Sequence, residues 1–556
     1  MADPHALPMA VLRGEPDAYD MGKERLMGRQ AAGHGFLRAA VQARGDRPIR
    51  GLSSSAARAQ GFAAIVGGID PQAPVEWIPT DEFGRIAETG VFYLADVALP
   101  LHARMRLRIG PAAFSLCGVT HTTASAGSMD EVVNLLREPV MPWDALVCTT
   151  GAVVETVRRV HEAEADYLHW RHGPDIRLDL PQLPIIPLGV HCDDFVISPE
   201  ARAAARADLG LDPDTVVALF VGRLVFHAKA HPVAMYQGLQ AAAERAGRPV
   251  ALIMCGWAPN DNVSQAFASG ATLFAPDVRT IFVEGRDPPK RDQAWAAADL
   301  FVSLSDNIQE TFGLTPIEAM AAGLPVVATD WNGYRSTVRH GIDGYRVATW
   351  APGPDMGAPL ARGHENGTLT YDRYCWAAAA TTSVDLAELG EVMGRLVQNP
   401  DLRRQMGEAG RKRAREAFHW PVVYRQYQEL WADLNARRTA ALADPETLAR
   451  LRAAPRAAAS RLDPFHAFGH YPTNQITQAT ILTLAPGATP ADLKAALDHT
   501  LFMELPAPRQ QLEALHALVT ASPLSVGDAA TQLSTSLPAL ARAAGILAKI
   551  GVVRLG

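Results

Sequence analysis

The chain has 556 residues, 48% of them hydrophobic and 20% charged, and its formal net charge is −7. This composition is that of an ordinary globular protein and the length is enough for two or three domains, so a disordered or fibrous chain is excluded. The mild negative charge argues against nucleic acid as a general partner.

Residues 1–200 are predicted to alternate short apolar strands with helices, and the helices are expected at 129–138 and 152–164. The strands are indicated by five apolar runs: FAAIV (62–66), VFYLADV (91–97), FSLCGVTHT (114–122), ALVCTT (145–150) and LPIIPLGV (183–190). This rhythm is typical of a doubly wound α/β sheet, so we assign residues 1–200 to a first Rossmann-like domain.

A glycine-rich segment of this domain is a candidate for ligand contact. Residues 26–37 place Gly28, Gly33 and Gly35 ahead of a helix expected to begin near Phe36. Glycines there would let the backbone approach a ligand at the helix N-terminus, and a plain turn is the alternative.

Two polar residues that follow predicted strands are further candidates. His121 lies among threonines directly after the strand FSLCGV, and it either reaches a ligand or is satisfied by the neighbouring hydroxyls. Asp96 follows the strand VFYLA and could meet ligand hydroxyls, with a helix cap or a turn as the alternative.

The strand rhythm restarts at Val216, after a predicted linker at 196–212. The new strands are LFVGRL, VALIMCG, TIFVEG, LFVSLS and PVVAT. The first of them runs into a Gly222-Arg223 turn, with Lys229 six residues after the arginine. Tandem Rossmann-like halves bind ligands in the cleft at the carboxyl ends of their strands.

The stretch 305–333 is the most informative part of the chain. Thr315 is predicted to cap a short helix, with Glu318 completing a Thr-x-x-Glu capping box and Gly323 ending the helix. The free amides at the start of that helix, with Gly313 before it, form an anion site suited to a pyrophosphate. Glu310 and Glu318 would repel a pyrophosphate unless they contact neutral hydroxyls, and sugars supply such hydroxyls.

These residues resemble the donor site of retaining GT-B glycosyltransferases of the family-four, or group 1, type. The resemblance lies in Glu310-Thr-Phe-Gly-Leu314 followed by Pro316-Ile-Glu-Ala-Met-Ala-Ala-Gly323, and more loosely covers about residues 20–437. It implies a GT-B fold, with residues 201–437 as the donor domain and its closing helices. It also implies a long helix after Trp420 that returns to the first domain.

The resemblance assigns roles to the candidate residues. Glu310 would contact the donor sugar, Glu318 the ribose, and the amides of Gly313 and Leu314, beside Thr315, the phosphates. Arg223, after Gly222, and Lys229 would neutralise the leaving diphosphate, although the family usually has Lys-Gly where this chain has Lys229-Ala230. His121 would reach the donor sugar and the acceptor, and the glycine segment with Gly33 and Gly35 would lie on the acceptor side.

The implied activity is metal-independent, retaining transfer of a sugar from a UDP- or GDP-linked donor to an unidentified glycan, lipid-linked or small-molecule acceptor. No cofactor is implied. A non-catalytic nucleotide-sugar sensor is the alternative, and an epimerase or phosphorylase on the same scaffold explains the spaced glutamates less well. The five cysteines are odd in number and lack Cys-x-x-Cys spacing, so neither disulfides nor a metal site is predicted.

The location is expected to be cytoplasmic, because no apolar run of about 18 residues occurs. The basic segment 102–108 could touch anionic lipid at the inner membrane face or a phosphorylated acceptor, and an exposed arginine face without a ligand is the alternative.

Three further segments lie outside the motifs. Residues 350–376 are rich in Gly and Pro and are predicted to be an inserted loop near the cleft. A linker is expected at 438–462. Residues 463–556 resemble a winged helix-turn-helix with three helices and a short hairpin, but they carry five Lys/Arg against six Asp/Glu. We therefore expect a module for protein contact or dimerisation rather than for DNA binding.

Overall fold

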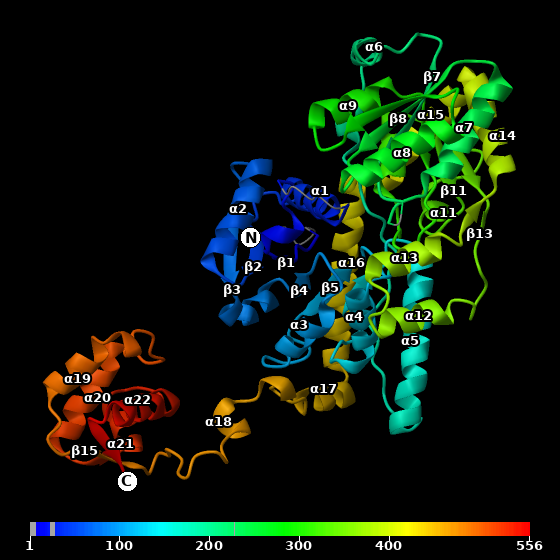
Figure 1. The fold of residues 1–556 in the computed structure, drawn as a ribbon. Helices are drawn as coiled ribbons and strands as arrows, with labels where there is room; N and C mark the ends of the chain where they lie inside the picture. Colours follow the sequence, from blue (N-terminus) through cyan, green and yellow to red (C-terminus); the bar gives the residue numbers. More distant parts are fainter. Residues whose placement is uncertain (1–6, 23–27, 227) are drawn as a thin grey trace. The chain divides into compact units, whose positions relative to one another are not determined.

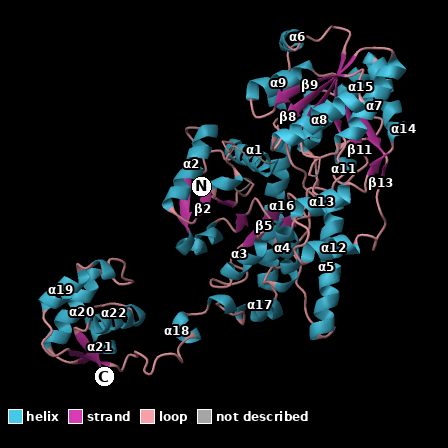
Figure 2. Cartoon of the chain, viewed as in Figure 1, coloured by secondary structure: helices cyan, strands magenta, loops and turns pink. Residues whose placement is uncertain are grey.

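The computed structural model describes residues 7–22, 28–226 and 228–556. By their internal contacts they form two units, Met1–Ala458 and Ala459–Gly556 (Figure 1). Helices flank the strands throughout (Figure 2).

The first sheet of the larger unit is parallel and has the order β3-β2-β1-β4-β5-β6. Its strands are β1 (Val11–Arg13), β2 (Ile49–Ser53), β3 (Val75–Pro79), β4 (Val91–Tyr93), β5 (Ser115–Val119) and β6 (Ala145–Val147). Its helices are α1 (Gly28–Gln42), α2 (Ala56–Ile69), α3 (Leu99–Arg106), α4 (Ala126–Arg137) and α5 (Gly151–His172). The strand order reverses between β1 and β4, which makes the sheet doubly wound.

The second sheet repeats this topology, with the parallel order β12-β11-β10-β7-β8-β9. Its strands are β7 (Val216–Val221), β8 (Val250–Gly256), β9 (Arg279–Glu284), β10 (Leu300–Ser303), β11 (Val326–Thr329) and β12 (Gly344–Val347). Its helices are α6 (Pro199–Asp208), α7 (Pro232–Ala246), α8 (Asp261–Phe274), α9 (Pro288–Ala297), α10 (Leu314–Ala322), α11 (Tyr334–Thr337), α14 (Leu386–Gln398) and α15 (Pro400–Arg413). Two such sheets in one unit form the GT-B fold that the sequence predicts.

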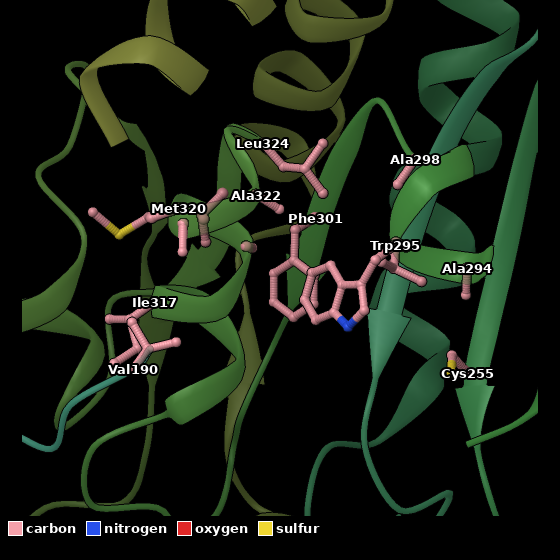
Figure 3. Packing of buried hydrophobic residues seen from close by; sticks show 14 of the residues in the cluster. Val190, Cys255, Ala294, Trp295, Ala298, Phe301, Ile317, Met320, Ala322 and Leu324 are labelled. Atoms are coloured by element: carbon pink, nitrogen blue, oxygen red, sulfur yellow. The ribbon is translucent and has the colours of Figure 1, made fainter. Parts of the chain in front are cut away.

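The inner apolar strands of the second sheet, β7, β8, β10 and β11, are buried on both faces. On one face, Trp295 of α9 stacks on Phe301 of β10 with ring centroids 5.6 Å apart, while Ile317 and Met320 of α10 fill the same layer (Figure 3). A parallel strand covered on both faces must be apolar along its whole length, which explains why these strands were visible in the sequence.

The long helix α16 (Trp420–Ala443) returns to the first domain, as predicted. Its residues Trp420, Tyr424, Tyr427 and Trp431 surround Phe36 of α1. This aromatic cluster joins the end of the second domain to the core of the first.

Two of the predicted strands in the first domain are wrong. Residues 62–66 lie inside α2, which Ser55 caps by accepting a hydrogen bond from the Arg58 amide. Residues 183–190 form only isolated bridges, Cys148 with Ile185 and Val190 with His419. A short apolar run does not distinguish a buried strand from the buried face of a helix.

The predicted linkers contain helices. Helix α6 occupies most of 196–212. In the segment 438–462, α16 continues to Ala443 and α17 (Pro445–Arg452) follows, with Leu451 packed against Met141 and Trp143. Most of that segment therefore belongs to the larger unit.

The inserted segment also differs from the predicted loop. A two-stranded antiparallel sheet of β13 (Thr349–Trp350) and β14 (Ser383–Val384) closes its base. Between the strands lie α12 (Ala358–Glu365) and α13 (Tyr371–Ala379).

The basic segment 102–108 does not present a row of free cations. The guanidinium of Arg106 is fully buried and pairs with Asp144 at 2.6 Å, while Arg104 pairs with Glu138. None of the described helices is long and apolar enough to cross a membrane.

The smaller unit has its own core around Leu482, Leu512, Leu540 and Leu547. Its longer helices are α19 (Pro490–Leu497), α20 (Arg509–Ala521), α21 (Val526–Gln532) and α22 (Leu537–Ile550). The predicted terminal hairpin is wrong: β17 (Val553–Leu555) is a single strand that pairs with β15 (Ile481–Leu484), which also pairs with β16 (Leu524–Ser525).

Candidate functional site

The candidate site lies after β7 and β10, at the carboxyl ends of neighbouring strands of the second sheet. The loop after β10 is held by residues that follow β11. The Thr329 hydroxyl donates to the Ser305 carbonyl at 2.6 Å, the Trp331 indole donates to the Asn307 carbonyl at 3.0 Å, and the Asn332 amide donates to the Glu310 carbonyl. These bonds position the Glu310 backbone.

Glu310 and Lys229, predicted from separate motifs, meet in the structure. The Lys229 ammonium lies 3.5 Å from Oε2 of Glu310. The other carboxylate oxygen accepts from the amides of Thr311 and Phe312 at 3.2 and 3.3 Å. The carboxylate is therefore fixed on one side, while the lysine remains 37% exposed.

Helix α10 begins differently from the prediction. Its N-cap is Gly313, in the left-handed region at φ 87°, and no side chain caps the helix. The predicted Thr315–Glu318 capping box is therefore wrong. A Cβ on Gly313 would lie 2.2 Å from the Tyr334 ring, so glycine is needed for both conformation and space. The first amides of α10 have no side-chain cap and are available to an anion.

Glu318 is thereby released from a capping role. The described residues give its carboxyl no hydrogen-bond partner, and burial raises its pKa to about 7, against a weaker opposite effect of Arg291. A partly exposed carboxyl without a protein partner is suited to accept hydrogen bonds from ligand hydroxyls.

Within the described ranges, Arg223 makes no hydrogen bond or ion pair through its guanidinium. Its backbone turn is fixed by Gly222, whose amide donates to the Cys255 carbonyl at 3.0 Å, and by Leu224, whose amide donates to the Trp257 carbonyl at 2.9 Å. Burial lowers the pKa of the Arg223 guanidinium, which Asp372 and Tyr371 partly oppose. A half-buried cation without an ion pair favours an anionic ligand.

The His121 loop of the first domain contacts the Glu310 loop directly. The Thr311 hydroxyl donates to the His121 carbonyl at 2.6 Å, and the Thr150 hydroxyl donates to the Thr311 carbonyl at 3.1 Å. Because the Ala95 carbonyl, 3.0 Å from His121 Nε2, can only accept, Nε2 carries the hydrogen. Burial lowers the pKa of His121, so the neutral ring leaves Nδ1 as an acceptor.

The predicted glycine loop is wrong. Gly28, Gly33 and Gly35 all lie in helix α1, and residues 26 and 27 fall outside the described residues. A Cβ on Gly33 would lie 2.2 Å from the Ala18 carbonyl, and one on Gly35 would lie 2.3 Å from the Trp420 indole. Gly33 and Gly35 therefore allow close packing and do not form a phosphate loop.

Asp96 has protein partners on both carboxylate oxygens. It pairs with Arg13 at 2.7 Å and accepts from the Ala98 amide at 2.9 Å. Asp96 therefore has the turn role that was the alternative to ligand contact, and its carboxylate remains partly exposed.

Sequence reasoning missed two residues beneath the site. Asp306 is buried and accepts from the His231 amide at 3.1 Å, and burial raises the pKa of its carboxyl to about 7. One oxygen of Asp306 and the amide nitrogen of Asn307 are buried without a hydrogen-bond partner. Their position just before Glu310 was the available signal, but a loop Asp-Asn pair normally indicates only a turn.

Sequence reasoning also assigned no role to the inserted helix α13. Burial raises the pKa of its Tyr371, which Thr122 partly opposes, and its Asp372 raises the pKa of Arg223. Sequence spacing carries no signal for such effects, because they join segments about 150 or more residues apart.

A separate hollow between α1 and α2 does not include the site residues. Its lining contains His34, Arg38 and Arg44. Arg38 pairs with Asp194 at 2.6 Å, and Arg44 pairs with Asp70 at 2.7 Å. We place the candidate site at the carboxyl ends of β7 and β10, where Lys229 meets Glu310.

Residues 201–351 match the family described as glycosyl transferases group 1. The D-inositol 3-phosphate glycosyltransferase of Segniliparus rotundus is 31% identical over 254 residues, covering 45% of this chain and 51% of that protein. The alpha-maltose-1-phosphate synthase of Mycolicibacterium smegmatis is 28% identical over 306 residues, covering 54% of this chain and 66% of that protein. The chain thus spans about half to two thirds of the length of these relatives.

Solved structures that resemble the chain include Anabaena Alr3699/HepE in complex with UDP-glucose. Its identity is 16% and its TM-score 0.48, with 74% of this chain and 97% of that chain covered. Sucrose-phosphate synthase from Thermosynechococcus elongatus has 17% identity and a TM-score of 0.46, with 78% of this chain and 100% of that chain covered.

Proposed function

We propose, from the match of residues 201–351 to the group 1 glycosyl transferases, that this chain transfers a sugar from a nucleotide sugar to a hydroxyl acceptor with retention of configuration. The observation that carries the proposal is the meeting of Lys229 with Glu310 beside the uncapped start of α10. The named activities of the relatives support the same class of reaction, and one of them is a glycosyltransferase that is 31% identical over 254 residues.

The leaving diphosphate would be held by two cations and by backbone amides. Arg223 carries no ion pair within the described part of the chain, and Lys229 is partly exposed beside Glu310. The amides after Gly313 add the partial positive charge of a helix N-terminus. Such preorganised groups stabilise charge as it develops on the leaving group, so a metal ion is not required in this proposal.

The two glutamates would hold neutral parts of the donor. Glu310, fixed by two amides, would orient the sugar, and Glu318 would accept hydrogen bonds from the ribose. The donor base is proposed to be uracil or guanine, and no further cofactor takes part.

On the acceptor side, His121 would contact the donor sugar and the incoming hydroxyl through Nδ1. The chain offers no obvious covalent nucleophile in the motif residues, which favours attack from the face that the diphosphate leaves. In that mechanism an oxygen of the donor phosphate takes the acceptor proton while the sugar-phosphate bond breaks.

The smaller unit is proposed to contact protein, either a partner or a second copy of this chain. Its longest helix α22 carries only Arg542 and Lys549 as cations, and Arg509 of α20 already pairs with Asp498 and Glu513. Few free cations favour a protein surface over phosphates. We propose a cytoplasmic location, with contact at the inner membrane face as the alternative.

A binding and hydrolysis screen tests the proposed function. The full-length protein would be heated with UDP-glucose, UDP-N-acetylglucosamine or GDP-mannose, since a ligand at 100 times its Kd adds about 2.7 kcal/mol of stability. The best donor would then be incubated without acceptor. Slow hydrolysis that Arg223→Ala reduces, and that the surface control Arg404→Ala does not, supports an enzyme.

Other outcomes of the screen are equally clear. Donor binding without hydrolysis, and without transfer to any acceptor offered, would favour the sensor. No stabilisation by any nucleotide sugar or nucleoside diphosphate would refute both readings. Nuclear magnetic resonance of the first-formed product would give the anomeric configuration and test retention.

A further inference from the structure

Thr311 links the two Rossmann-like domains by two hydrogen bonds. Its hydroxyl donates to the His121 carbonyl at 2.6 Å, and its carbonyl accepts from the Thr150 hydroxyl at 3.1 Å. His121 follows β5 and Thr150 follows β6, which are paired strands of the first sheet, whereas Thr311 follows β10 of the second. One residue of the second domain therefore joins the loops that leave two neighbouring strands of the first.

The two threonines that make these bonds are buried. Thr311 is 4% exposed and Thr150 is fully buried. The Thr150 oxygen also accepts from the Val153 amide at 3.4 Å, which caps α5. Water competes poorly for hydrogen bonds between buried groups, so the loss of either hydroxyl has a cost that the loss of an exposed hydroxyl would not have.

The backbone of Thr311 is tied to Glu310. The Thr311 amide donates to the Glu310 carboxylate at 3.2 Å, and the Asn332 side chain donates to the Glu310 carbonyl. Gly333 packs against the same backbone, since a Cβ there would lie 2.4 Å from the Thr311 carbonyl oxygen. A shift of Thr311 would therefore also displace the Glu310 carboxylate.

His121 is held by its own domain as well as by Thr311. Its ring Nε2 donates to the Ala95 carbonyl at 3.0 Å, while its backbone carbonyl accepts from Thr311. The His121 ring and the Glu310 carboxylate come from different domains and are thus joined through one intervening residue. Where two groups must act on one sugar, a misplacement of about 1 Å can lower the rate about a hundredfold.

We propose that Thr311 is a positioning residue that sets the placement of His121 relative to Glu310. The inference rests on the proposed function, in which these two side chains contact the donor sugar. The nucleoside diphosphate is assigned to other groups, namely Arg223, Lys229 and the first amides of α10, and the Thr311 hydroxyl is directed at the His121 carbonyl instead. The hydroxyl should therefore govern turnover and not the affinity for UDP or GDP.

Thr311→Val tests the proposal, because valine has nearly the shape of threonine and keeps both the amide and the carbonyl. Turnover would be measured with the donor on which the wild type is active among UDP-glucose, UDP-N-acetylglucosamine and GDP-mannose. We expect kcat to fall about tenfold, while calorimetry gives the wild-type Kd for UDP and GDP. Thr311→Ser, which keeps the hydroxyl, should restore most of the lost rate.

A buried threonine elsewhere in the second domain provides the matched control. Thr337 is fully buried, and its hydroxyl donates to the Tyr334 carbonyl of the same domain. Thr337→Val should change neither kcat nor the Kd for UDP and GDP. An equal fall of kcat in Thr337→Val and Thr311→Val would show a general effect of removing a buried hydroxyl and would overturn the positioning role.

The other outcomes separate this inference from the proposed function. Wild-type kcat in Thr311→Val, or an equal loss in the valine and serine variants, would overturn the positioning role. A matching loss of affinity for UDP and GDP would also overturn it, because the effect would then lie in nucleotide binding. A wild type that neither hydrolyses nor transfers any of the three donors would instead refute the proposed function.

Thr150 gives a second route to the same contact. Thr150→Val removes the other hydrogen bond to Thr311 and should lower kcat without changing the Kd for UDP and GDP, whereas Thr150→Ser should keep the wild-type rate. Thr150→Val also removes the cap of α5, so Ser55→Ala, which removes the cap of α2 in the same domain, is the matched control. Equal loss of kcat in Ser55→Ala would assign the effect to helix capping, and unchanged kcat in Thr150→Val would contradict the role of this contact.

Discussion

Replacing Glu318 by glutamine should affect stability and binding in opposite directions. Burial raises the pKa of Glu318 from 4.5 to about 7, so the carboxyl stays protonated in the folded protein over a pH range in which the unfolded chain ionises it. The folded state therefore loses stability as pH rises from about 4.5, and the loss is complete above about pH 7. The difference between the folded and unfolded pKa values corresponds to a loss of at most about 3 kcal/mol in the free energy of unfolding. Partial exposure of the carboxyl reduces this loss to about 1–2 kcal/mol.

Glutamine removes this ionisation cost. At pH 8 the ligand-free Glu318→Gln protein should unfold at a higher temperature than the wild type, and at pH 5 the difference should shrink. The same change should weaken the binding of UDP or GDP, because a neutral amide replaces the charged carboxylate that accepts hydrogen bonds from the ribose hydroxyls. We expect a loss of about 1–2 kcal/mol, or about 5- to 30-fold in Kd.

Thermal unfolding at the two pH values and titration calorimetry with UDP and GDP check these expectations. The exposed Glu408→Gln on α15 is the matched control and should change neither quantity. Glu310→Gln should leave the affinity for free UDP or GDP unchanged and lower only the affinity for the nucleotide sugar. Wild-type affinity of Glu318→Gln for both nucleoside diphosphates would refute the ribose role, and unchanged stability at pH 8 would refute the buried-carboxyl argument.

Three further results are expected. Arg223→Ala should lower turnover about a hundredfold without unfolding the protein. Steady-state rates at saturating donor measure this, and unchanged turnover would show that Arg223 takes no part in the mechanism. Gly35→Ala should lower stability by about 1–3 kcal/mol, because the new Cβ would lie 2.3 Å from the Trp420 indole. Gly28→Ala is the control and should not lower stability, because a Cβ there has nothing within 4 Å. Equal thermal midpoints of the two variants would contradict the packing role of Gly35. A chain ending at Ala458 should bind nucleotide like the full chain but differ from it in light scattering or in partner binding. If the full chain, but not the truncated chain, bound duplex DNA tightly and in a salt-sensitive way, the proposed protein-contact role would be wrong.

The repeating α/β architecture and the donor motifs could be predicted from the sequence alone. The inner strands of the second sheet are continuous apolar runs because both of their faces are buried, and such runs can be recognised in the sequence. The Glu310 and Glu318 spacing and the Gly222-Arg223 turn are likewise local patterns. The meeting of Lys229 with Glu310 follows from the rule that neighbouring parallel strands end at the same edge of a sheet.

Tertiary structure decided what local patterns leave ambiguous. Gly33 and Gly35 match a ligand loop in sequence, but contacts with Ala18 and Trp420 give them a packing role. Thr315 matches an N-cap in sequence, but Gly313 is the N-cap in the structure. Its backbone is left-handed and lies against the Tyr334 ring, where a side chain has no room. The hydrogen bonds of Thr311 with His121 and Thr150 join segments far apart in the chain. Such contacts depend on how whole domains pack, so no local spacing in the sequence encodes them.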